Sequence, residues 1–435
     1  MRRSFAVLVV LFVVLAAGSG DAARAGDWRP EIEVTHNDPA LPGNLEEVVS
    51  NPANAWTVVR IRPGTYGLRA EMRLQPGMCL AGSQELVDAD GDLVPDVASD
   101  GSPVVVAGTH TVIDGTSVAP PTFQRTDCNG NVFTATEPLI AFGKWNRIAR
   151  LTIQGASIPV GESSIPIGDG DIEVEVTECV LTANATGTTR SLTFANSGCA
   201  ARGARSVLVL TRSVVRNGEV GVTIANLIAG DVGNSTANGP VLHAILGWNR
   251  ITGRIAGVTA FGGAFGTDGA SIRIDSIGNI YEKCSRTGIL LMGGRGNGIA
   301  DPVNENSIRF LSIRDTLRAN GTGALADRAQ VILYGAELTR ADADVAGNRL
   351  GATLWYPRFE RGGAPVDVRV YGANLGGSGN TADVSIHAAT VVAFPGGEPV
   401  RGTITFRDNQ PATLAPPVPN VATVKGWQGK FDRVD

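Results

Sequence analysis

Hydrophobic and polar residues alternate in short runs that recur along most of the chain. The clearest unit spans residues 271–294. Its first run has the two-residue period of a strand with one buried face: Ile272, Arg273, Ile274, Asp275. A second apolar run starts at Gly288, and no helical period fits the polar, turn-rich segment between them. Such a unit cannot bury its own apolar face, so the pattern predicts further copies stacked on it.

Two markers of this unit recur with the same irregular spacing. The glycine that opens the second run recurs at steps of 36, 31, 35 and 28 residues, as Gly221, Gly257, Gly288, Gly323 and Gly351. The first run recurs at steps of 35, 30, 36, 23 and 37 residues, at Val207, Leu242, Ile272, Ile308, Val331 and Val368. A constant coil with loops of differing length has this signature. We therefore expect a β-solenoid with regular coils over about residues 207–389.

The residues that precede these coils start the solenoid. Asn44 is placed to cap a short helix over Leu45–Ser50, which has Glu46 and Glu47 in its first turn. Strand patterns follow that end in PGTY, over residues 58–66, and in G-x-x-L-x-G, over residues 77–82.

With these elements the chain resembles the pectin-lyase-like superfamily. The resemblance implies an all-β, single-domain right-handed parallel β-helix with a short N-terminal cap helix, over residues 26–407. We expect residues 408–435 to form an extended, Pro-rich tail. One fold carries many activities, so the resemblance leaves the activity open.

The first 25 residues predict export. Arg2 and Arg3 precede an apolar core over residues 5–17, and residues 23–25 fit a small-x-small cleavage site. We expect a signal peptide and a secreted or periplasmic protein. The alternative is that this segment stays uncleaved as a membrane anchor. No later segment is long and apolar enough to span a membrane.

The charge of the chain limits its partners. The net charge is −5, and cleavage after residue 25 makes it −7, because three arginines and one aspartate are lost. An acidic chain of this kind argues against general nucleic-acid binding. We expect a monomer. Of the five cysteines, Cys79–Cys128 and Cys179–Cys199 are possible pairs that leave Cys284, but five cysteines do not determine the connectivity.

An aspartate-rich loop is the candidate metal site. Residues 85–101 contain Asp-x-Asp-x-Asp, and the sequence is similar to the calcium loops of thrombospondin type 3 repeats and dockerins. Ca²⁺ takes six to eight oxygen ligands, which close carboxylates supply. The sequence thus predicts a structural Ca²⁺ held by Asp88, Asp90, Asp92 and Asp96. The alternative is a solvated acidic loop.

Stacked coils place equivalent outward residues in files, which we call ladders. One predicted ladder contains Leu208, His243, Arg273, Arg309, Ile332 and Arg369, and the next contains Leu210, Ile245, Asp275, Leu311, Tyr334 and Tyr371. The second run gives Ala225, Phe261, Met292 and Trp355, and the turn before it gives Glu219, Arg254, Arg286 and Arg349. Arginines bind carboxylates by paired hydrogen bonds. We therefore take Arg273, Arg309, Arg286 and Trp355 as candidate ligands of an acidic polysaccharide.

The sequence supports a catalytic site less strongly than it supports a binding site. Hydrolases that resemble polygalacturonases carry aspartates before the second run, where paired carboxylates act as acid and base. This chain has Arg254 and Arg286 there. A lyase is therefore favoured over a hydrolase, with Arg273 and Asp275 as the best catalytic candidates. His243 is a lone candidate base, and the other histidines have no metal-binding spacing with it.

Two functions follow from the sequence. The first is recognition of an extracellular, acidic polysaccharide, with lyase-type cleavage as a further step. The second is a non-catalytic surface or adhesive scaffold, which the missing catalytic motifs favour.

Overall fold

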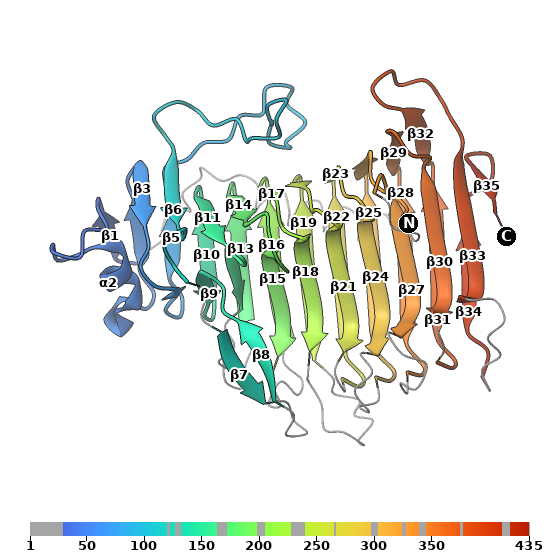
Figure 1. The fold of residues 1–435 in the computed structure, drawn as a ribbon, viewed down its shortest axis with the longest axis horizontal. Coiled ribbons are helices and arrows are strands. Elements are labelled where there is room, and N and C mark those ends of the chain that lie inside the picture. Colours follow the sequence, from blue (N-terminus) through green and yellow to red (C-terminus); the bar gives the residue numbers. More distant parts are fainter. Residues whose placement is uncertain are drawn as a thin grey trace.

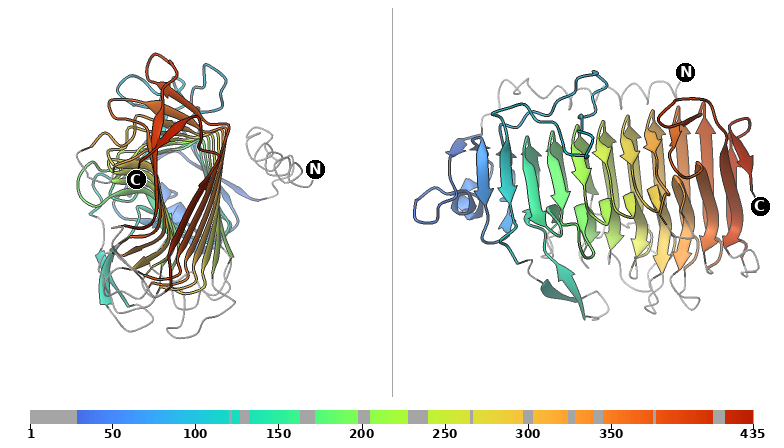
Figure 2. Two further views of the ribbon diagram at one scale, coloured as in Figure 1. Left: turned by 90° about the vertical axis from the view of Figure 1, so that its right-hand side faces the viewer. Right: turned by 45° about the horizontal axis from the view of Figure 1, so that its top comes forward.

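The computed structural model describes residues 29–119, 122–126, 132–162, 172–197, 205–227, 240–264, 267–296, 303–323, 328–338, 345–374, 377–410 and 418–434. Its strands form three long parallel sheets, because successive coils stack along one axis (Figure 1). Seen along that axis, the sheets form the sides of a flattened prism (Figure 2). This confirms the predicted all-β class and the parallel β-helix. The predicted signal peptide lies outside the described residues.

The three sheets are named A, B and C in the order in which each coil visits them. Sheet A contains β1 (Glu31–Val34), β2 (Val58–Ile61), β5 (Cys79–Ala81), β10 (Asn146–Ala149), β13 (Ile172–Thr177), β16 (Arg205–Thr211), β19 (Val241–Gly247), β22 (Ser271–Ile277), β25 (Ser307–Ile313), β28 (Arg349–Trp355), β31 (Thr381–His387) and β34 (Val421–Lys425). Sheet B contains β3 (Gly64–Gly67), β6 (Thr111–Asp114), β11 (Thr152–Ala156), β14 (Val180–Ala183), β17 (Val214–Arg216), β20 (Arg250–Ile251), β23 (Ile280–Glu282), β26 (Thr316–Arg318), β29 (Arg358–Arg361) and β32 (Thr390–Ala393). Sheet C contains β4 (Met72–Arg73), β9 (Ile140–Phe142), β12 (Val160–Glu162), β15 (Arg190–Ser197), β18 (Val220–Leu227), β21 (Ala256–Ala264), β24 (Thr287–Gly296), β27 (Val331–Leu338), β30 (Asp367–Asn374), β33 (Gly402–Gln410) and β35 (Phe431–Arg433).

Few elements lie outside these sheets. The predicted cap helix is present as α2 (Leu45–Ser50), and the Asn44 side chain accepts a hydrogen bond from the Glu47 backbone N–H at 3.1 Å. A short 3-10 helix, η1 (Pro52–Asn54), follows it. An antiparallel hairpin, β7 (Thr122–Thr126) and β8 (Val132–Thr136), projects from the solenoid (Figure 1).

Each coil has one strand more than the sequence analysis assigned. In residues 271–294 the polar segment between the two apolar runs contains β23, which belongs to sheet B. Strands this short show no clear alternation, so the period could not reveal them. Beyond the predicted end of the solenoid at residue 407, β34 and β35 extend sheets A and C, with Phe431 buried.

Because the short sheet B strands were not predicted, some later strands were assigned to the wrong ladders. β27 and β30, which begin at Val331 and Asp367, lie in sheet C and not with β25. Gly351 lies in β28 of sheet A and pairs with Arg309, whereas Gly323 lies in no strand. Strands of sheets A and C share the two-residue period, so a count along the chain could not separate them.

One predicted coil was also one residue out of register. Leu208 and Leu210 are buried in the core, and Val207 is the residue that pairs with His243 on the outer face. A shift of one residue exchanges the two faces of a strand. Two coils further on, in β22, the assignment is confirmed, because Ile272 and Ile274 point inward and are buried.

Asparagine side chains fix the corner between sheets C and A. The backbone N–H of Asn306 donates to Oδ1 of Asn348 at 3.0 Å, and that of Asn348 donates to Asn380 at 3.0 Å. A Cβ atom on Gly294 would lie 2.5 Å from the Asn348 side chain, so glycine makes room for this asparagine. Each amide both donates and accepts, which satisfies the buried corner and locks the coils together.

A second buried ladder, at the corner between sheets A and B, ends in an acid. Asn249 accepts a hydrogen bond from the Ser213 backbone N–H, and Asn279 accepts one from Asn249 at 2.8 Å. The Asn279 backbone N–H donates to Oδ1 of Asp315 at 2.8 Å, and Ser312 Oγ donates to Oδ2 at 2.6 Å. Asp315 is fully buried, and this burial raises the pKa of its carboxyl from 3.8 to about 6.

We predict that Asp315→Asn stabilises the fold above pH 6. The raised pKa of Asp315 means that folding favours the protonated acid, so the wild type loses stability as the pH rises from about 4 through about 6. Asparagine keeps one acceptor oxygen for the Asn279 N–H and places an NH2 donor opposite the Ser312 hydroxyl, which can accept, and it carries no charge. The variant should therefore gain on the order of 3 kcal/mol at pH 8 and nothing at pH 3.5. Urea unfolding at both pH values measures this.

The matched control is Asp38→Asn, because this aspartate is exposed and lies outside the ladder. It should follow the wild-type pH dependence. A variant at Asp315 that is equally destabilised at both pH values would contradict the assignment.

Candidate functional site

Two of the four predicted polysaccharide ligands lie side by side on the outer face of sheet A. Arg273 on β22 pairs in register with Arg309 on β25. The Arg273 side chain is 50% exposed and Arg309 is exposed. Among the described residues, Arg309 makes no ion pair. Neighbouring strands lie about 4.8 Å apart, so the two cations share a small area of open surface.

An aspartate and a histidine complete this group. Asp275 Oδ2 lies 2.8 Å from Nε2 of His243 on β19 and 2.9 Å from Nη2 of Arg273. The Asp275 side chain is only 2% exposed. Burial alone would raise the pKa of this carboxyl, but hydrogen bonds from His243 and Arg273 outweigh burial and lower the pKa below its usual range. Asp275 is therefore a carboxylate that fixes both neighbours.

His243 and Arg273 were predicted to share one ladder, but no contact between His243 and Asp275 was predicted. The structure has His243 opposite Arg273 and Ile245 opposite Asp275, so the contact is diagonal. The predicted ladders already placed these two residues as diagonal neighbours on adjacent strands, and long side chains can reach that far.

Aromatic side chains extend the same face toward the C-terminal coils. Trp355 on β28 pairs with Ile313, further along the strand that carries Arg309. Its ring stacks on that of His387 with centroids 4.0 Å apart, and Tyr356 lies beside it at 6.2 Å. Trp355 is 38% exposed and Tyr356 is 57% exposed. The predicted grouping of Trp355 with Phe261 and Met292 is wrong, since Trp355 lies in sheet A.

Arg286 does not join this face. It precedes β24 of sheet C, and its Nη2 lies 3.8 Å from Oε1 of Glu337, which also contacts Arg295 at 3.6 Å. The Arg286 side chain is 17% exposed. The predicted positions of Arg254 and Arg286 before sheet C strands are confirmed, but Arg349 opens β28 of sheet A instead.

The middle of the outer face of sheet C is buried. Met292, Tyr334 and Tyr371 form an apolar cluster on it and are almost completely buried. A ladder of threonines beside this cluster has buried hydroxyls that find no hydrogen-bond partner among the residues that the structure describes: Thr193, Thr223 and Thr259. A polymer cannot contact these side chains as the structure stands. The outer face of sheet A, by contrast, carries the exposed Arg273 and Arg309.

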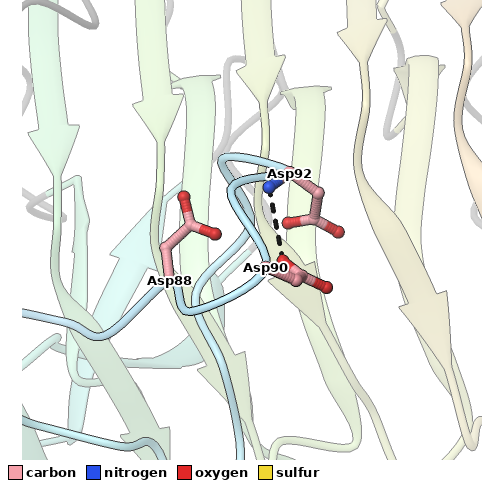
Figure 3. Close-up of side chains that lie close together, drawn as sticks. All are labelled: Asp88, Asp90 and Asp92. Carbon is pink, nitrogen blue, oxygen red and sulfur yellow. Dashed lines mark hydrogen bonds between the residues drawn. The ribbon is translucent and has the colours of Figure 1, made fainter.

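The aspartate-rich loop brings three of its four predicted ligands together. Ligand oxygens of Asp88, Asp90 and Asp92 lie within 4.8 Å of one another (Figure 3). Burial, with repulsion from Asp90 and Asp88, raises the pKa of the Asp92 carboxyl. Asp96 lies outside this group, and its Oδ2 accepts a hydrogen bond from the Ala89 backbone N–H at 2.7 Å.

The loop that carries these aspartates is docked on later coils. Arg250 Nε donates to the Pro95 carbonyl at 3.0 Å, and Arg216 Nη1 donates to the Gly101 carbonyl at 2.7 Å. Both arginines belong to sheet B, over which the loop extends (Figure 1). A cation bound here would stabilise the loop and, through it, the contact between distant coils.

The described cysteines give no disulfide pair from the sequence analysis. Cys179 and Cys284 are buried free thiols, and burial raises the pKa of each to about 12. Cys199, the possible partner of Cys179, lies outside the described residues. Cys128 lies outside the described residues. None of the described helices is long and apolar enough to cross a membrane.

Comparisons with known proteins give a distant likeness of the fold. No family model matches the chain, and no curated protein matches it. Among solved structures, it is similar to the Family 28 exopolygalacturonase of Yersinia enterocolitica, with 11% identity and a TM-score of 0.28 over 86% of this chain and 80% of that chain. A likeness this low assigns neither residues nor an activity to this chain.

Proposed function

We propose that this protein binds an acidic polysaccharide outside the cell, along the open face of sheet A. The observation that carries the proposal is the register of Arg273 and Arg309, which places two exposed guanidinium groups on neighbouring strands. Asp275 pairs with Arg273, whereas Arg309 makes no ion pair among the described residues, so Arg309 can form paired hydrogen bonds with a bound carboxylate. The chain as a whole is acidic, so this cationic surface is a local feature.

The aromatic residues support a saccharide as the source of the carboxylate. Trp355 is exposed and lies on the same face as Arg309, one strand away. Stacking on His387 holds its ring in place. A fixed, exposed aromatic ring offers an apolar surface to the apolar face of a sugar, and it loses little conformational entropy on binding. A long polymer would contact both the arginines and this ring.

The alternative is a non-catalytic scaffold without a glycan ligand. Arginines in the turns before β21 and β24, where hydrolases with this fold carry acids, favour this alternative over a hydrolase. A binding experiment distinguishes this alternative from the proposed function, because a scaffold without a glycan ligand binds no uronate polymer.

We predict that Arg309→Gln weakens binding to uronate polymers about tenfold, which corresponds to ~1.4 kcal/mol. Trp355→Ala should weaken it by a smaller factor, about threefold to tenfold, through loss of ring contact. Isothermal titration with polygalacturonate and alginate measures both effects. Binding of the wild type should also weaken as salt is added, because exposed charges are screened.

The control for these variants is Arg62→Gln. Arg62 is exposed and ion-paired with Glu33 near the N-terminal coils, far from the proposed site. Its loss should leave the affinity unchanged. Equal weakening by Arg62→Gln would indicate a general charge effect, and failure of the wild type to bind any acidic glycan would support the scaffold.

We also propose that the Asp88–Asp92 loop holds a structural Ca²⁺ ion. Three converging carboxylates support this proposal, since hard cations prefer oxygen ligands and like charges repel without one. Backbone carbonyls and water would supply the remaining ligands.

Removal of calcium should lower the melting temperature by several degrees, because a ligand that binds only the folded state stabilises it. Differential scanning calorimetry with and without a chelator, at fixed pH and ionic strength, measures the shift. Asp90→Asn should abolish most of it. Asp100→Asn, in the same loop but bonded to Ser102, should not. An unchanged melting temperature on chelation would rule out the ion.

A further inference from the structure

His243 is held in one tautomer by a buried carboxylate. Asp275 is ionised and can only accept hydrogen bonds, so Nε2 of His243 must be the donor in the 2.8 Å contact. In neutral His243 the lone pair then lies on Nδ1, which makes no hydrogen bond among the described residues. The side chain is 30% exposed. A histidine whose one nitrogen is fixed by a carboxylate and whose other nitrogen is open has the arrangement of a general base.

The surroundings of this histidine suit an anionic substrate. On one side of β19, His243 faces the apolar Val207. On the other side it faces Arg273, with Arg309 one strand further on. Arg273 contacts Asp275 through Nε and Nη2, at 3.2 and 2.9 Å, so its Nη1 points away from that carboxylate. The one acidic group in contact with His243 is therefore already neutralised by an arginine.

We propose that His243 is the catalytic base of a uronate-polymer lyase on sheet A, with Asp275 as its positioning residue. This inference rests on the proposed binding of an acidic polysaccharide and adds a reaction to it. Arg309 would hold the carboxylate of one uronate unit, which makes the hydrogen on the adjacent ring carbon more acidic. His243 Nδ1 would then lie on the same face as that hydrogen.

The step is a β-elimination that needs no oxidant or reductant. Nδ1 takes the proton from the carbon next to the carboxylate, and the electrons of that C–H bond form a carbon–carbon double bond. The bond from the next ring carbon to the glycosidic oxygen breaks, and water gives a proton to the departing oxygen. Arg309 stabilises the negative charge that develops on the carboxylate during proton removal.

The test compares binding and cleavage in the same preparations of the full chain. Polygalacturonate and alginate are the probes, ultraviolet absorbance of the unsaturated uronate reports cleavage, and titration calorimetry reports binding. The wild type should cleave at least one polymer. His243→Gln should lower cleavage at least 100-fold and change binding less than twofold.

Positioning by Asp275 has its own readout. Asp275→Asn should lower cleavage about 10-fold to 100-fold and shift the pH profile of kcat/KM, whereas Asp275→Glu should restore part of the rate. A residue that only supports the fold would not move the pH profile. The control is His36→Gln, a partly exposed histidine near the cap helix, which should match the wild type.

Two outcomes overturn the inference and leave the proposed function intact. One is a wild type that binds a uronate polymer but produces no unsaturated ends. The other is a His243→Gln variant that cleaves as fast as the wild type. A wild type that binds neither polymer would overturn the proposed function, and this inference with it.

Discussion

Parallel hydrogen bonding between successive coils is the constraint on which the rest of this protein depends. A coil of about thirty residues buries its apolar side only against its neighbours, so no coil is stable alone. At the corners the side chains of Asn306 and Asn348 each give and receive hydrogen bonds between coils. A slip of one residue would break these bonds and would also turn charged outward residues into the core.

The same register makes the outer faces differ. On sheet A it stacks Arg273 on Arg309, and the charges remain solvated because the face is open. On sheet C it stacks Met292 on Tyr334, and both side chains are buried. Arg286 precedes a strand of sheet C and is compensated by a carboxylate, as a poorly solvated charge requires. A polymer that needs both charge and access finds them together on sheet A.

The buried carboxyls of this solenoid have different hydrogen-bond and ion-pair partners, and these partners decide whether each carboxyl is ionised. Asp275 has a histidine and an arginine as neighbours, and Glu360 has two arginines, Arg318 and Arg358. In both acids these partners outweigh burial and lower the pKa. Asp315 has only neutral donors around it, and burial raises its pKa. The acids that face outward are thus kept ionised, while the one inside the solenoid is kept largely neutral under mildly acidic conditions.

The sequence by itself determined the local features of this protein. The cap helix Leu45–Ser50, the inward positions of Ile272 and Ile274, and the pairing of Arg273 with Arg309 were all predicted, because each depends on a short period or on one repeat next to another. Only the tertiary structure decided which sheet each later strand joins. The two-residue period is the same in every sheet, and short strands such as β23 leave no period at all. The contact of His243 with Asp275 and the burial of the middle of sheet C likewise depend on diagonal reach and on burial between coils, neither of which is encoded in the spacing of residues along the chain.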